Sequence, residues 1–460
     1  MIPVELGSYT DLFSEYTELR VQENRTLNVS IVNGDVMGNS RSAGSGVSAR
    51  TFSKGLWGFA SNPIIDNKSI KKVIRAATRN SQFLAERENR AGYILPSSPG
   101  RSSEDFSTKK KRLSQKEIID FMMEIDGRIE GKYSRVVSRT SGLRILDMEK
   151  SIVTSDGSSV YSMIPRSIIY VSLSTEYKGE PVQLFNVYGG LGQFEDLFST
   201  PEALFGKLDE HYEHLIRKAE GVHPAPGMKE CILDAALAGI LSHEAIGHTT
   251  EADIVRGGSV AGDYMDQQVA SPLVTLVDFA NRALGKTCPV PVFIDDEGTV
   301  AEDAVIIEHG ILKRFMHNKE SAASFNARPT GNARAYRFSD EPIIRMRNTA
   351  ILPGKSKLEN MIASVDDGYY LMKPSDGQAD STSEFMFGVV QGYEIKKGCL
   401  GRAIRDTSIS GVAFDMLKTI TAVSDDMKWS NGGMCGKKQP IPVGMGGPAV
   451  KCRINIGGKK

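Results

Sequence analysis

Hydrophobic and polar residues alternate along the first sixty positions, in a pattern typical of β-strands joined by turns. The segments TELRVQEN, TLNVSIVNGDVM and GVSARTF each follow a period of two, which predicts strands with one buried face. Asn33-Gly34-Asp35 predicts a hairpin turn between two of them. Residues 67–90 have a helical pattern, and the polar stretch 95–112, rich in Ser and Pro, predicts a loop or joint.

A second set of elements follows this stretch. A helix is expected from about residue 114, then several strands, then a helix over roughly 201–220 with apolar residues at helical spacing. The segment GVHPAPG, residues 221–227, has two prolines and two glycines and predicts a boundary. We therefore expect an N-terminal region over 1–222, with sub-segments of about 1–95 and 113–222, and a C-terminal domain over 228–460.

The C-terminal domain is expected to begin with a buried helix, because residues 231–241 are apolar nearly all round. Beyond about 255 the chain has short alternating runs rich in Gly, Val and Ile, interrupted by helical pieces near 318–325, 355–364 and 411–424. The fold class predicted is α+β. An N-terminal α+β region with antiparallel sheet and helices precedes a largely antiparallel β domain.

The predicted buried helix ends in an HExxxH motif, His243-Glu244-Ala245-Ile246-Gly247-His248. Burying two imidazoles and a carboxylate is costly unless they bind something. In the zinc-peptidase motif HExxH the histidines are four residues apart and face one metal ion. Five residues turn a regular helix to an offset of about 140°, so a metal site predicts a distorted or terminated helix at Ala245–Gly247. Gly247 would permit that break.

The alternative is that His243 and His248 are ordinary core histidines bonded to backbone carbonyls. A zinc site also needs a third protein ligand, for which Glu251, Asp253 and Cys435 are candidates. Lys437 could keep the thiol of Cys435 ionised. The residue types alone do not choose among the three.

Several separated motifs, taken in order, resemble the TldD/PmbA family, whose members have been described as modulators of DNA gyrase. The motifs are HEAIGHTTEAD, DDEGTV, IEHGILKRFM, PTGNARAY, ILPGKS and GGMCGKKQPIPVGMGGP. The N-terminal segment from YTELRVQEN to GFASN also resembles the first part of the family. The TldD branch carries HExxxH and the PmbA (TldE) branch lacks it, so the chain resembles the TldD branch.

This resemblance implies a metallopeptidase with one Zn²⁺ per active chain, bound by His243, His248 and Cys435. It implies Glu244 as general acid and base, and leaves Glu251 and Asp253 as supporting groups or alternative ligands. Two residues of the PTGNARAY loop, Asn332 and Arg334, are expected to contact the peptide. The resemblance also implies a cytoplasmic homodimer, or a heterodimer with a TldE/PmbA-like subunit. Unfolded or flexible peptides, such as leader peptides and antitoxin-like proteins, would be cut in its chamber.

Charge and cysteine content narrow the function classes. Lys plus Arg and Asp plus Glu are 56 each, so the net charge is zero, which argues against nucleic-acid binding. The first residues lack the basic and apolar regions of a signal peptide, and no apolar run predicts a membrane span. Five scattered cysteines indicate reduced, cytoplasmic thiols.

Three other functions stay open at this point. The chain could be a non-catalytic peptide-binding or partner subunit, with the histidine pair as a relic. It could regulate gyrase or bind nucleic acid, which the zero net charge disfavours. It could also be a cysteine peptidase with Cys435 as nucleophile.

Overall fold

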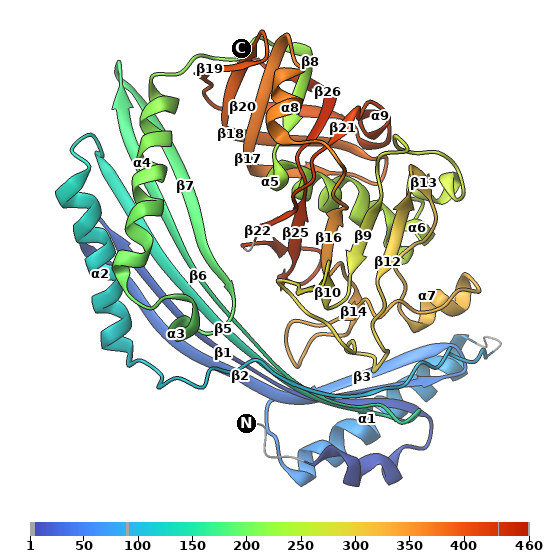
Figure 1. Ribbon diagram of the computed structural model, residues 1–460. Coiled ribbons are helices and arrows are strands. Elements are labelled where there is room, and N and C mark those ends of the chain that lie inside the picture. The colour runs from blue at the N-terminus through green and yellow to red at the C-terminus, as the bar shows by residue number, and fades with distance from the viewer. Residues whose placement is uncertain (1–4, 89–91, 431, 459–460) are drawn as a thin grey trace.

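The computed structural model describes residues 5–88, 92–430 and 432–458. Its N-terminal half is built on one seven-stranded sheet with the order β3-β2-β1-β5-β6-β4, in which β7 also pairs with β6. The strands are β1 Tyr16–Val32, β2 Asp35–Ser53, β3 Leu56–Asn62, β4 Arg101–Asp105, β5 Ser138–Thr154, β6 Ser159–Tyr177 and β7 Glu180–Leu191. The sheet is long and curved, and the C-terminal half lies over its concave side (Figure 1).

The start of the sheet follows the sequence pattern closely. The first two predicted segments cover β1 and the start of β2, and the third lies within β2. Asn33 and Gly34 turn between the two strands with φ of 49° and 92°. This confirms the predicted hairpin, because such turns need left-handed backbone. The segment 95–112, expected to be a loop, contains the short strand β4, which pairs in parallel with β6 at the sheet edge. The serine-rich sequence RSSED does not predict a strand, because backbone pairing rather than apolar side chains holds β4 in place.

Helices cover one face of this sheet. They are α1 Asn67–Glu88, α2 Gln115–Lys132 and α4 Phe205–Ala219, with the short turns η1 Leu6–Leu12, α3 Phe194–Leu197 and η2 Pro201–Leu204. The helix α2 begins at a capping box, in which Ser114 and Glu117 bond each other's backbone N–H. Leu27, Val29 and Ile31 of β1 pack with α2 and α4 in one buried cluster, so the alternate positions of β1 face the C-terminal half.

The C-terminal half contains two larger sheets, with the orders β13-β12-β9-β16-β25-β22 and β17-β8-β26-β20-β18-β19; β21 pairs with β26. Their strands are β8 Gly227–Leu233, β9 Leu276–Phe279, β12 Ala304–Glu308, β13 Ile311–Leu312, β16 Asn348–Ile351, β17 Asp367–Ala379, β18 Glu384–Lys396, β19 Cys399–Ala403, β20 Thr407–Val412, β21 Ala422–Val423, β22 Lys428–Ser430, β25 Gly444–Gly447 and β26 Val450–Ile456. Three two-stranded pairs are β10 Arg282–Ala283 with β11 Lys286–Thr287, β14 Ala333–Arg334 with β15 Ile343–Ile344, and β23 Met434–Cys435 with β24 Ile441–Pro442.

One helix, α5 Ala235–Leu241, is buried between these two sheets and packs against β16, β22 and β25 on one side and β8 and β17 on the other. The prediction that this helix begins at Cys231 is wrong. Residues 231–233 belong to strand β8, and the Asp234 carboxylate caps the helix by accepting from the Leu237 N–H at 2.8 Å. A short apolar run suits a buried strand as well as a buried helix, so the pattern alone did not separate them.

The remaining helices are short. They are η4 His248–Thr250, α6 Ala252–Arg256, η5 Val260–Tyr264, α7 Lys319–Ser324, α8 Leu358–Ala363 and α9 Ala413–Lys418, with the π-helical turn η3 Ser242–Gly247 directly after α5. The three helical pieces expected after residue 255 are therefore confirmed as α7, α8 and α9.

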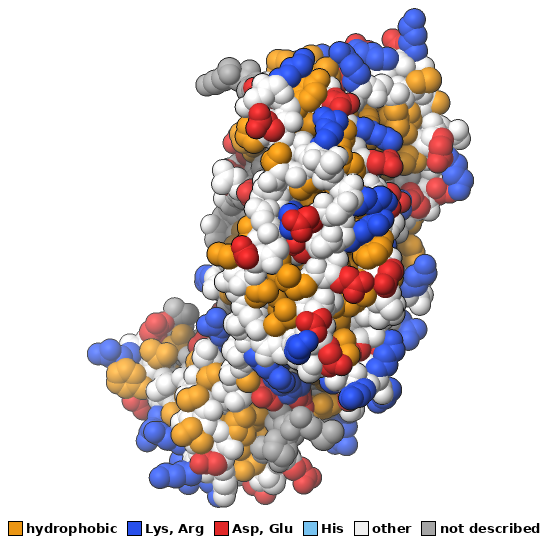
Figure 2. Space-filling model, turned by 90° about the vertical axis from the view of Figure 1, so that its left-hand side faces the viewer, with side chains coloured by type: hydrophobic (Ala, Val, Ile, Leu, Met, Phe, Trp, Pro, Cys, Tyr) orange, Lys and Arg blue, Asp and Glu red, His pale blue; other side chains and the backbone are white. Residues whose placement is uncertain are grey.

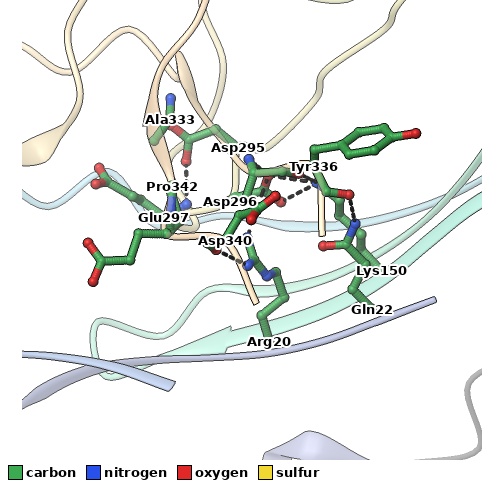
Figure 3. A network of polar contacts seen from close by, with 12 residues as sticks. Arg20, Gln22, Lys150, Asp295, Asp296, Glu297, Ala333, Tyr336, Asp340 and Pro342 are labelled. Atoms are coloured by element: carbon green, nitrogen blue, oxygen red, sulfur yellow. Dashed lines mark hydrogen bonds and ion pairs between the residues drawn. The ribbon is translucent and has the colours of Figure 1, made fainter. Parts of the chain in front are cut away.

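A buried polar network joins the two halves (Figure 3). The Arg20 guanidinium of β1 donates to the Asp340 carbonyl at 2.6 Å, and Gln22 donates to the Tyr336 carbonyl at 2.7 Å. From β5, Lys150 Nζ donates to the Asp296 carboxylate at 2.6 and 2.9 Å. Removing one partner of a buried pair is strongly destabilising, so this network fixes the C-terminal half on the sheet.

The predicted class, α+β with mostly antiparallel sheet, is confirmed. Strands β1 and β5 pair along their length, so both N-terminal sub-segments share one sheet; the boundaries at 222 and 228 stay a prediction. Acidic and basic side chains are interspersed over the face in Figure 2, in keeping with the zero net charge. None of the helices in the described part of the chain combines the length and apolar character needed to cross a membrane.

Candidate metal centre

Three side chains from distant parts of the sequence meet beside η3. The possible ligand atoms of His243, His248 and Cys435 all lie within 4.8 Å of one another. Cys435 comes from β23, 187 positions after His248, and its Sγ lies 3.3 Å from His248 Nε2. The two imidazole rings have centroids 5.1 Å apart. Two imidazoles and a thiolate form a donor set that suits a zinc ion.

The histidines share one side because the chain forms a π-helical turn between them. The backbone N–H of His248 donates to the carbonyl oxygen of His243, a hydrogen bond that spans five residues. This wider turn places residues five apart above one another, which a regular α-helix does not. The distortion predicted at Ala245–Gly247 is therefore confirmed.

The reason expected for Gly247 is wrong. Its φ of −58° and ψ of −52° are ordinary helical values, so it does not break the helix through unusual backbone freedom. A Cβ atom at this position would instead lie 1.9 Å from the Met346 sulfur. Gly247 is needed because the turn packs closely against a buried methionine.

His243 shows how well the site fits a metal ion. Its side chain is fully buried, and neither ring nitrogen has a hydrogen-bond partner among the described residues. Buried polar atoms are almost always satisfied, and an exception calls for a ligand or a functional role. The position of this ring beside another imidazole and a thiol fits a bound transition-metal ion.

Glu251 lies behind His248 and is not one of the clustered donors. Its fully buried carboxylate accepts from His248 Nδ1 at 2.8 Å, which turns Nε2 of that ring toward Cys435. Burial raises the pKa of Glu251, but the His248 ring and the Lys437 ammonium outweigh it and hold the pKa below its usual range. A carboxylate on the outer nitrogen of a ligand histidine is a recurring feature of metal sites.

Electrostatics favour a thiolate at Cys435 and an imidazolium at His248. Burial opposes ionisation of Cys435, but the imidazoles of His243 and His248 outweigh it and lower the pKa of the thiol to about 4. Burial likewise disfavours the charged His248 ring, yet the Glu251 carboxylate and Cys435 raise its pKa to about 10. The ammonium of Lys437, which was expected to act on this thiol, bonds the carboxylates of Glu251 and Asp253.

Glu244 stands at the accessible side of the cluster. Its side chain is 26% exposed, and its Oε2 lies 3.7 Å from His248 Nε2. A carboxylate that reaches both solvent and the donor cluster is placed to exchange a proton with a water molecule there.

The two residues expected to contact a peptide are inside the fold. Asn332 is fully buried, donates to the Asp278 carboxylate at 2.8 Å and accepts from the Thr330 hydroxyl at 2.6 Å. Arg334 is buried and donates to the backbone carbonyls of residues 346 and 442 at 2.6 and 2.9 Å. Both side chains hold together the segments around the cluster.

Sequence reasoning missed Arg345. Its guanidinium is fully buried and donates to the carbonyls of Cys435 and Gln439, each at 2.7 Å, so it anchors the hairpin that carries the thiol. The available signal was the run IIRMRN, in which two arginines stand among apolar residues. Charged residues in such runs are rarely buried without a partner.

Comparisons with known proteins identify the family of the chain. Residues 226–458 match the family model described as the PmbA/TldA metallopeptidase C-terminal domain, and residues 17–81 match PmbA/TldA metallopeptidase domain 1. A metalloprotease TldD homolog of Buchnera aphidicola is 32% identical, with 93% of this chain and 90% of that protein covered. A zinc metalloprotease TldD homolog of Saccharolobus solfataricus is 31% identical over 66% of each chain.

The solved structure of TldE from Thermococcus kodakarensis has the same fold, with a TM-score of 0.76, 17% identity and 98% of both chains covered. These findings confirm the resemblance seen in the sequence and the prediction of an enzyme that hydrolyses peptide bonds. The chain belongs to the PmbA/TldD family of metallopeptidases.

Proposed function

We propose that this chain is a TldD-type peptidase that binds one Zn²⁺ through His243, His248 and Cys435. The observation that carries the proposal is the fully buried imidazole of His243, whose ring nitrogens make no hydrogen bond within the described residues and which stands beside a second imidazole and a thiol. The name of the Saccharolobus solfataricus relative, a zinc metalloprotease, supports zinc as the metal.

The chain's own residues divide the work of hydrolysis. A bound Zn²⁺ supplies Lewis acidity toward a peptide carbonyl and lowers the pKa of water. Glu244 takes the proton of the attacking water on its carboxylate and passes it to the leaving amine. Glu251 holds the proton on Nδ1 of His248, which leaves Nε2 of that ring for the metal.

The substrates in this proposal are unfolded or flexible peptides, such as leader peptides and antitoxin-like proteins, cut inside the chamber of a dimer. The partner is a second copy or a TldE/PmbA-like chain, supported by the fold shared with a TldE protein. A cytoplasmic location is part of the proposal, because all five cysteines are free and free thiols are usual in a reducing compartment.

Metal content per chain tests the proposal. Protein purified without chelators is measured by elemental analysis, beside His243→Ala and Cys435→Ser. About one zinc per wild-type chain, lost in both variants, is the expected result. Wild-type protein that stays empty after zinc is added contradicts the proposal and favours a non-catalytic partner subunit. If Cys435→Ser keeps its zinc and His243→Ala loses it, the third ligand would be Glu251 or Asp253 instead of Cys435.

A second candidate is a cysteine peptidase, favoured by the distance of 3.3 Å between Cys435 Sγ and His248 Nε2. Such a pair resembles a nucleophile with its base, although the Cys435 side chain is only 3% exposed. Peptide cleavage that continues after complete removal of metal by a chelator would favour this candidate. Cleavage that stops and returns with zinc favours the metallopeptidase.

A further inference from the structure

We propose that Lys437 is a positioning residue that locks the strand of Cys435 onto the turn of His248, so that the zinc donors face one another before metal binds. The inference rests on the proposed zinc site and adds a residue to it. Lys437 follows Cys435 by two positions, and Glu251 follows His248 by three. A contact between Lys437 and Glu251 therefore ties together the two segments that supply these ligands.

The ammonium group of Lys437 uses all of its hydrogen-bond donors on Glu251, Asp253 and the Ile344 carbonyl. Its Nζ lies 3.0 Å from Glu251 Oε2, 2.8 Å from both carboxylate oxygens of Asp253 and 3.2 Å from the Ile344 carbonyl. An ammonium group has three N–H donors, so two carboxylates and one carbonyl satisfy it. The side chain is 11% exposed. Because it is largely shielded from water, its ion pairs are stronger than ion pairs at the surface.

One oxygen atom links the lysine to the histidine. Glu251 Oε2 accepts from both Lys437 Nζ and His248 Nδ1, at 3.0 and 2.8 Å, whereas buried Oε1 has no partner among the described residues. The lysine thus determines which carboxylate oxygen faces His248. Through that oxygen it determines the direction in which Nε2 of the ring points.

Loss of Lys437 is expected to loosen the site without unfolding the hairpin. The carboxylates of Glu251 and Asp253 would be left close together with no cation between them, and like charges repel. The Cys435 backbone would still be held by Arg345, which donates to its carbonyl oxygen at 2.7 Å. The expected consequence is a misaligned His248 ring and weaker metal binding.

The dissociation constant for zinc tests this directly, measured by competition with a chelator for wild type, Lys437→Met, Glu251→Gln and the double variant. Partners of ligand histidines typically contribute roughly 10- to 100-fold in metal affinity, and Lys437→Met should weaken binding by about this factor. Because Lys437 acts through Glu251, the double variant should bind about as weakly as Glu251→Gln alone. Lys437→Arg should recover most of the affinity.

Lys438→Met is the matched control. Lys438 is exposed and makes no side-chain hydrogen bond or ion pair within the described ranges, so its loss should leave the dissociation constant unchanged. The melting temperature of each metal-free variant shows whether it is folded. If Lys437→Met does not fold, the dissociation constants for zinc of Lys437→Arg and Glu251→Gln are compared instead. Lys437→Arg should bind zinc more tightly than Glu251→Gln.

Two results would overturn the inference while leaving the zinc site intact. One is wild-type affinity in Lys437→Met, and the other is a double variant whose loss equals the product of the two single losses. Wild-type protein that binds no zinc would instead remove the proposed function, and the inference with it.

Discussion

The backbone N–H of His248 donates to the carbonyl oxygen of His243, so the two residues are joined through their main chains, and their imidazole rings lie edge to face with centroids 5.1 Å apart. A hydrogen bond over five residues absorbs the extra position that separates HExxxH from HExxH. The turn is held in a buried setting, since Ala245 and Ile246 are fully buried. Packing around the turn therefore controls the relative positions of the two rings.

Substitution Gly247→Ala should damage both stability and metal binding. The added methyl group meets the Met346 sulfur at 1.9 Å, and overpacking of this kind costs about 1–3 kcal/mol. The measurements are the melting temperature and the zinc content of the variant. The double variant Gly247→Ala with Met346→Ala should recover part of the metal binding, because it removes the clash. An unchanged melting temperature in the single variant would contradict the packing argument.

Substitution Glu244→Gln should leave zinc in place and strongly lower kcat. Glu244 is not one of the clustered donors, and the amide keeps the size of the side chain while losing its basicity. A general base contributes roughly 10²- to 10⁴-fold in rate, so kcat should fall by about that factor. Zinc content by elemental analysis and kcat on an unstructured peptide check the two roles. Loss of zinc from Glu244→Gln would make Glu244 a ligand.

Substitution Asn332→Ala should lower stability rather than weaken substrate binding. The Asn332 amide donates to the fully buried Asp278 carboxylate, and its removal leaves that group short of a donor. Leaving a buried polar group unsatisfied costs about 1–3 kcal/mol. Thermal unfolding and steady-state kinetics separate the two roles. A raised KM with an unchanged melting temperature would restore Asn332 as a peptide contact.

Stability should fall in mild acid through His211. This ring is fully buried, and burial lowers its pKa to about 3, against about 6.5 in the unfolded chain. Its contribution is fully present above the unfolded pKa and is lost as pH falls toward the folded one. At pH 4.5 the loss is roughly 2–3 kcal/mol.

Denaturant unfolding at pH 7 and pH 4.5 measures this loss. The His211→Gln variant has no titrating group at this position, so the difference in its free energy of unfolding between the two pH values should be smaller than in wild type. Equal pH dependence in the two proteins would show that His211 is not the acid-sensitive group.

Local features of the fold could be predicted because neighbouring residues decide them. The hairpin at Asn33-Gly34 and the helix start at Ser114 depend on backbone preferences within a few residues, and the structure has both. The distorted turn at Ala245–Gly247 followed from the angle between residues five apart in a helix. By contrast, the apolar run from Cys231 predicts a helix, whereas its first residues form strand β8. The strands that pair with β8 are β17 and β26, which lie far away in the sequence, so neighbouring residues do not indicate the pairing.

The sequence alone showed that two histidines and a glutamate lie on one short segment, and that this segment must be irregular if both histidines bind one metal ion. Which of Glu251, Asp253 and Cys435 meets them depends on the folded chain: Cys435 comes from 187 positions away, and Glu251 lies on the far side of the His248 ring. The folded chain also brings Lys437 to the Glu251 carboxylate and Arg345 to the backbone carbonyl of Cys435. The physical reason is that spacing in a helix fixes the direction of nearby side chains, whereas contacts between distant segments depend on how two sheets pack around a buried helix.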